Sequence, residues 1–127
     1  MTRVPYDRRF DPPAPVLSLQ LRLPLGEDWL QLAGVVDTGA DITVFPEDIA
    51  ARHLPVAGQI GVRGVTGVVQ RAVLYRAELR VAGARRVLVV AGFGLELIVG
   101  RDLLRHLIVE LDGPADRMTV TVPHVPS

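Results

Sequence analysis

The residues best suited to chemistry lie in one short run, Val35–Phe45, which reads VVDTGADITVF. Asp37-Thr38-Gly39 places an acid, a small hydroxyl and a glycine among residues that otherwise favour a strand. An unpaired carboxylate is costly to bury, so Asp37 either sits in an ordinary turn or serves a reaction. Apolar neighbours on both sides favour a loop tucked into the core: Leu32, Val35, Val36, Ile42, Val44 and Phe45.

A second run, Leu97–Leu104, reads LIVGRDLL. An apolar strand ends at Gly100, and a helix follows it. Glycine suits a position where another backbone approaches closely. The simpler interpretation is a helix start with Asp102 in its first turn.

Together the two runs are much more specific than either alone. VVDTGADITVF followed by LIVGRDLL resembles the retroviral-type aspartic proteases, the retropepsin-like family, and the likeness extends over about Val16 to Val122. The resemblance implies a mostly β, single-domain acid-protease half-barrel with a flap hairpin and a short C-terminal helix. It makes Asp37 the catalytic residue, supported by Thr38 and Gly39, with Gly100 and Arg101 as structural support.

Hydrolysis by two carboxylates needs one protonated and one ionised group that share a water, and close carboxylates share a proton in this way. Gly39 suits the site because, without a Cβ, its N–H can approach a carboxylate closely. The chain has a single Asp-Thr-Gly, and Asp112-Gly113 lacks the hydroxyl residue. The second carboxylate must therefore come from Asp37 of another copy, which predicts a homodimer acting on a peptide or protein substrate. In the family the terminal strands interleave between subunits, and Met118–Val122 is the expected equivalent.

The run VRGVTGV, Val62–Val68, matches the glycine-rich flap that closes over bound peptide in the family. A plain hairpin without function is the alternative. A phosphate loop is disfavoured because the Gly-Lys-Ser/Thr of such loops is missing.

The resemblance also assigns substrate contacts and one ion pair. Asp41 is expected to bind substrate backbone and to pair with Arg101, although two solvated charges are the simpler interpretation. The loop Gly92–Ile98 is expected along the substrate pockets, where Glu96 is unusual for an apolar pocket. The substrate-binding residues expected in full are Gly39, Ala40, Asp41, Gly64, Val65 and Ile98.

The elements that must position these residues can be predicted from periodicity and turn residues. The alternation in Val16–Leu23 indicates a half-buried strand, and Trp29–Val36 a second one. Further strands are expected at Val73–Val81, Val87–Val90, Ile98–Val99 and Met118–Val122, with a hairpin over residues 60–70 and a helix at Pro46–Leu54. In the helix after Ile98–Val99, Leu103, Leu104, Leu107 and Ile108 are expected to share one face. Many short strands indicate a closed or barrel-like β fold.

Residues 1–15 read as a Pro-rich N-terminal arm in which prolines prevent regular pairing, 16–122 as the protease domain and 123–127 as a C-terminal tail. Net charge is zero and pI is about 6.8, which gives no electrostatic case for nucleic acid or an anionic membrane. There is no Cys, and three separated His residues make a metal site improbable, so no cofactor is expected. Without a signal-peptide pattern, a cytoplasmic protein is expected.

A rival hypothesis keeps the fold without the reaction. Fold does not determine function, and the loop around Glu96 is unconventional, so the chain could be a catalytically silent dimerisation or peptide-binding module. Retention of Asp37 in an apolar setting favours the enzyme, because a module freed from catalysis has little reason to keep that acid.

Overall fold

The computed structural model describes residues 1–24, 26, 28–63 and 66–123. Strand β2 (Val16–Arg22) turns Leu17, Leu19 and Leu21 into the interior while Ser18 is exposed. It pairs antiparallel with β3 (Trp29–Val36) along its whole length, with Val16 opposite Val35. The alternating pattern therefore predicted both strands and the buried face of the first correctly.

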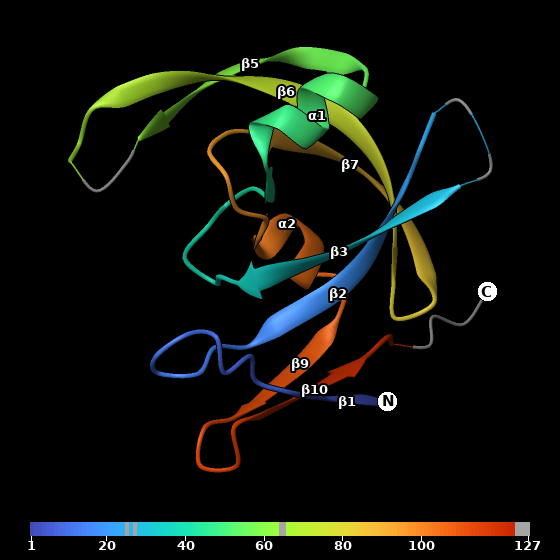
Figure 1. The fold of residues 1–127 in the computed structure, drawn as a ribbon, viewed down its shortest axis with the longest axis vertical. Helices are drawn as coiled ribbons and strands as arrows, with labels where there is room; N and C mark the ends of the chain where they lie inside the picture. The colour runs from blue at the N-terminus through green and yellow to red at the C-terminus, as the bar shows by residue number, and fades with distance from the viewer. Residues whose placement is uncertain (25, 27, 64–65, 124–127) are drawn as a thin grey trace.

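A seven-stranded sheet forms the body of the molecule (Figure 1). Its order is β2-β3-β8-β4-β7-β6-β5, and β2 also pairs with β6 through Gln20–Arg80 and Leu21–Leu79. This extra pairing closes the sheet on itself, which confirms the barrel-like fold expected from the many short strands. The remaining strands of this sheet are β4 (Val44–Phe45), β5 (Val56–Arg63), β6 (Val69–Val81), β7 (Ala84–Gly92) and β8 (Ile98–Val99).

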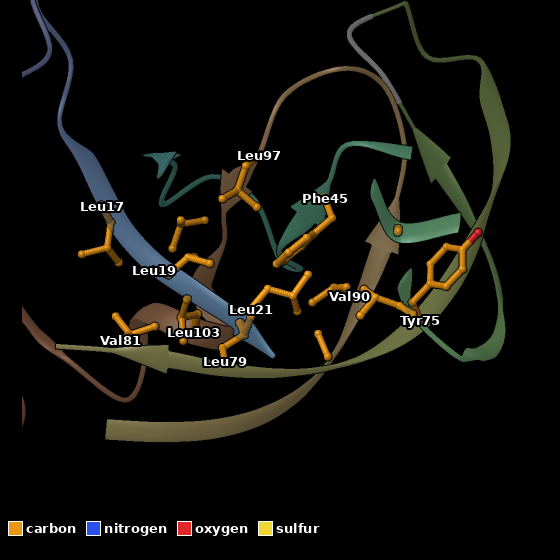
Figure 2. Packing of buried hydrophobic residues seen from close by; sticks show 14 of the residues in the cluster. Leu17, Leu19, Leu21, Phe45, Tyr75, Leu79, Val81, Val90, Leu97 and Leu103 are labelled. Carbon is orange, nitrogen blue, oxygen red and sulfur yellow. The ribbon is translucent and has the colours of Figure 1, made fainter. Parts of the chain in front are cut away.

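The core fills the interior of this closed sheet (Figure 2). Leucines from β2 and β6 meet Phe45 of β4, Val90 of β7 and Leu103 of the C-terminal helix, and Phe45 and Leu103 have no exposed surface. Complete burial of a Leu or Phe side chain contributes about 1.5–3 kcal/mol. The elements that carry the candidate site are thus anchored in one apolar cluster.

The two helices are short. Helix α1 (Glu47–His53) begins after Pro46, close to the predicted position. Helix α2 (Arg101–Leu104) is shorter than expected, and Ile108 does not continue its apolar face. Ile108 instead begins strand β9 (Ile108–Asp112) and is 58% exposed, so this part of the prediction was wrong. Leu103 is buried in the core and Leu104 and Leu107 pack against it, so three of the four predicted positions are confirmed and only Ile108 is not.

The N-terminal arm also differs from expectation. Strand β1 (Thr2–Pro5) pairs antiparallel with β10 (Arg117–Thr121), and Val4 lies opposite Met118. The prediction that prolines prevent regular pairing there was wrong, because Pro5 lies at the end of an outer strand, where a missing N–H is tolerated.

This pairing bears on the expected intersubunit sheet. The order of the three-stranded sheet is β1-β10-β9, so both edges of β10 are hydrogen bonded within the chain. Met118–Val122 therefore cannot interleave with a partner's strands while β1 and β9 stay in place. In this three-stranded sheet, β1 and β9 are the outer strands to which another strand could add.

The β5–β6 hairpin extends beyond the body, on the same side as the loop that follows β3 (Figure 1). Val62 lies opposite Gln70 and Arg63 opposite Val69, which confirms a hairpin over the run around residues 60–70. Both strands reach further than expected. Among the described residues, no helix has the length and apolar character needed to cross a membrane.

The β1–β10 pairing generates a stability prediction. Val4 packs against the core cluster while its neighbour Arg3 is exposed on the same strand. Val4→Asp should lower the free energy of unfolding by about 1–3 kcal/mol, because it places a carboxylate against apolar side chains. Arg3→Asp, the matched control, should change it by less than about 0.5 kcal/mol. Urea denaturation at one protein concentration measures both, and equal effects would contradict the observed packing of β1.

Candidate active site

Asp37 follows directly on β3 and is held through its backbone. Its N–H donates to the carbonyl of Val99 in β8, at 2.9 Å. Val35 and Val36 lie parallel to Ile98 and Val99, so β8 aligns the end of β3 just before the acid. The backbone of Asp37 is thus fixed by a sheet, even though the residue itself belongs to a loop.

In the single chain the side chains of this loop face outward. Asp37, Thr38 and Gly39 are exposed, whereas Thr43 and Phe45 further along the run are buried. The expectation of a loop tucked into the core was therefore wrong at its tip. The flanking segments enter the interior, and the Asp-Thr-Gly segment between them lies at the surface.

Gly39, two residues after the acid, shows why a residue without a side chain suits this position. Its N–H donates to Oδ1 of Asp37 at 2.9 Å, and a Cβ at Gly39 would lie 3.2 Å from that oxygen. The predicted close approach of this N–H to a carboxylate is confirmed. Ala40, which follows, donates its N–H to the carbonyl of Asp37 at 3.2 Å and closes the turn.

The two sequence runs cross at Gly100. A Cβ there would lie 2.6 Å from the carbonyl carbon of Ile42 and 3.0 Å from the carbonyl oxygen of Ala40. Contacts under about 3.0 Å cannot be accommodated without moving the backbone. The prediction that another backbone passes close to Gly100 is confirmed, and the backbone in question is that of the Asp37 loop.

Arg101 joins the same loop to α2. Its N–H donates to the carbonyl of Ala40 at 2.8 Å, and its guanidinium donates to the carbonyl of Thr38 at 2.7 Å. It also forms an ion pair with Asp41, as predicted. Both side chains are largely exposed, so the ion pair itself adds little to the free energy of unfolding. Its effect is to fix the position of the Asp37 loop relative to α2.

Thr43 is a buried part of this arrangement that was not predicted from the sequence. The hydroxyl of Thr43 donates to Oδ1 of Asp102 at 2.7 Å and accepts the N–H of Gly100 at 3.1 Å. Oδ2 of Asp102 accepts the N–H of Thr43 at 3.1 Å, and Oδ1 also accepts the N–H of Leu103 at 2.8 Å. The available signal in the sequence was Thr43 itself, a polar residue between Ile42 and Val44 in a segment expected to be buried.

The other predicted substrate-binding residues are placed as follows. Ile98 lies in β8, half-buried, opposite Val35 on one side and Val44 on the other. Asp41 is exposed beside Arg101. Gly64 and Val65 lie outside the described residues. Among the described residues, no group of three or more His, Cys, Asp or Glu side chains could hold a metal ion.

The pattern of the family described as "Retroviral aspartyl protease" matches residues 12–112. The chain belongs to this family. EIAV protease, in a complex with the inhibitor HBY-793, has a similar structure with a TM-score of 0.53 and 22% identity over 72% of this chain and 86% of that one. The solution structure of simian foamy virus (mac) protease is similar with a TM-score of 0.54 and 17% identity, over 72% and 92% of the two chains. No curated protein matches the sequence.

The Thr43–Asp102 contact generates a prediction. Thr43→Val keeps the shape of the side chain but leaves the carboxylate of Asp102 and the N–H of Gly100 without their hydroxyl partner. This should lower the free energy of unfolding by about 1–3 kcal/mol. Thr43→Ser keeps the hydroxyl and should recover most of the loss, while Thr2→Val, at an exposed threonine, should have almost no effect. Denaturation of all four proteins at one concentration measures this, and a Thr43→Val protein as stable as the wild type would contradict it.

Proposed function

We propose that this chain is an aspartic endopeptidase whose active site holds two Asp37 carboxylates, one from each subunit of a homodimer. The observation that carries the proposal is the exposed Asp37 carboxylate, with the N–H of Gly39 on one of its oxygens, in a family member with a single Asp-Thr-Gly. Since Asp37-Thr38-Gly39 is exposed in one chain, the same segment of a second chain can approach it.

In the proposed reaction the two carboxyl groups share one proton and hold one water between them. The ionised carboxylate takes a proton from the water while the water oxygen attacks the scissile carbonyl carbon. The protonated carboxyl group donates its proton to the carbonyl oxygen. The tetrahedral intermediate then breaks its C–N bond as a proton passes to the leaving nitrogen. The water supplies one hydrogen to the amine and the hydroxyl to the acid, so the atoms balance without a cofactor.

The substrate is an extended peptide, held by main-chain hydrogen bonds and by pockets for alternate side chains. Support comes from the placement of the β5–β6 hairpin on the side of the Asp37 loop (Figure 1). In the proposal this hairpin is the flap that Gly64 and Val65 were expected to belong to, and Gly39, Ala40, Asp41 and Ile98 contact the bound peptide. Thr38 of each subunit meets the other across the two-fold axis.

The dyad generates a direct test. Asp37→Asn should reduce kcat/KM on a diverse peptide library, at acidic to neutral pH, by at least about 10²-fold, because an amide can neither accept nor donate the shared proton. Stability should hardly change, because Asp37 is exposed. Asp48→Asn removes an exposed acid from α1 and serves as the control with full activity. Cleavage that survives in Asp37→Asn would refute the dyad, whereas a wild type that binds the peptides without cleaving them would favour the peptide-binding module.

The two-chain site generates a second test. Activity per chain should fall on dilution through the dimer dissociation constant, because only dimers carry both carboxylates. A tandem of two copies joined by a flexible linker should keep its activity on dilution, since the second copy is then always near. Asp37→Asn in only one copy of the tandem should abolish activity. A protein that is monomeric by sedimentation and still fully active in the kinetic assay would disprove the shared site.

A further inference from the structure

A cavity lies against β3, close in the chain to the candidate active site. It has a volume of about 260 Å³ and is walled mainly by the loop after β1, strand β3 and the loop before β8, together with Val16 of β2 and Pro46. Val35, which lines it, is two residues before Asp37 and donates its N–H to the carbonyl of Leu97, another lining residue, at 3.1 Å. The cavity is therefore fixed to the same backbone that carries the catalytic loop.

The walls of this cavity are mostly apolar. Val35 and Ala33 of β3, Phe10 of the N-terminal loop and Leu97 contribute to its lining, and Leu95 stands at the rim, 91% exposed. Binding sites for drug-sized ligands are usually about 300–1,000 Å³. A volume below that range fits a single long side chain better than an independent small molecule.

Three charged residues line the cavity, and two of them neutralise each other. Nε of Arg9 donates to Oδ2 of Asp7 at 3.0 Å, and its NH2 group to the same oxygen at 2.6 Å. Hydrogen bonds from the Arg9 side chain lower the pKa of the Asp7 carboxyl below its ordinary value. The backbone N–H of Arg9 also donates to Oδ1 of Asp7 at 2.9 Å, which fixes the loop locally.

Glu96 is the third charge and has no such partner. It is exposed at the cavity, and within the described part of the chain no hydrogen bond or ion pair engages its carboxylate. The lining thus has one uncompensated negative charge next to apolar walls. A lysine or arginine side chain fits both features, because its aliphatic stem packs on apolar surface while its charged end reaches a carboxylate.

We infer that this cavity is a subsite for a basic side chain of the peptide substrate and that Glu96 determines this specificity. The inference rests on the proposed function, because it takes the peptide to run past Asp37. An extended peptide presents alternate side chains to opposite sides, so a side chain near the cleaved bond reaches the cavity next to Val35. A homodimer carries the cavity twice, once on each side of the cleaved bond.

Cleavage of matched peptides tests the subsite. Peptides that differ only in carrying Lys, Arg, Met, Gln or Glu near the cleaved bond are compared at neutral pH, using the full chain. The wild type should prefer Lys or Arg over Met by about tenfold in kcat/KM, the size expected for a charge-assisted hydrogen bond at a partly exposed site. Glu96→Gln should abolish this ratio, and Glu96→Arg should invert it in favour of peptides with Glu. The preference should weaken as salt is raised.

Glu110→Gln is the matched control, because it removes the same charge from an exposed position on β9. Its ratio should equal that of the wild type. A Glu96→Gln protein with an unchanged ratio, or a wild type without preference for basic side chains, would overturn the inference.

Binding to the Asp37→Asn protein separates this inference from the proposed reaction. Fluorescence anisotropy with the same labelled peptides needs no cleavage, and Asp37→Asn should bind Lys and Arg peptides about tenfold more tightly than Met peptides. Asp37→Asn combined with Glu96→Gln should lose that difference. Absence of cleavage by the wild type, with this binding pattern present, refutes the reaction and keeps the subsite. Cleavage without any effect of Glu96 refutes the subsite and keeps the reaction.

Discussion

Two chain segments pass each other at Gly100 so closely that no side chain fits between them, and the geometry of the site depends on this crossing. A Cβ would lie 2.6 Å from the carbonyl carbon of Ile42. At the same place the hydroxyl of Thr43 bridges the N–H of Gly100 and the carboxylate of Asp102. Thr43 is fully buried, so water cannot replace its hydroxyl as a partner. Loss of the hydroxyl would therefore lower the free energy of unfolding by more than a solvent-exposed hydrogen bond contributes to it.

The consequence is that the position of Asp37 is set from outside its own loop. Strand β8 holds its N–H, and Arg101 at the start of α2 holds the carbonyls of Thr38 and Ala40. Leu103 of α2 is completely buried in the core. Helix α2 and the two-residue strand β8 are packed in the core and hydrogen bonded to the Asp37 loop. This surface loop can therefore keep a defined geometry.

One chain alone leaves the carboxylate facing solvent. Catalysis by paired carboxylates works best where water is excluded and the low dielectric strengthens electrostatic interactions. The isolated half-site has neither condition. In the proposed dimer the second Asp37 supplies the missing acid, and the hairpin supplies the cover. The adjacent cavity adds a distinct feature of this chain, since its wall carries the charge of Glu96 where an apolar lining was expected.

The local patterns in the sequence were enough to predict most of the strands and to single out Asp37 as the candidate acid. Alternation in β2 and the glycines at 39 and 100 follow from residue type and order, whereas the pairing of Asp41 with Arg101 followed from the family resemblance. Only the tertiary structure decided the pairing of β1 with β10, the exposure of Asp37 and the burial of Thr43 against Asp102. These depend on contacts between segments far apart in the chain, and neither periodicity nor turn chemistry encodes which distant segment meets which. The sequence alone thus determined which acid could act, whereas the fold decided which backbone groups and which neighbouring cavity surround it.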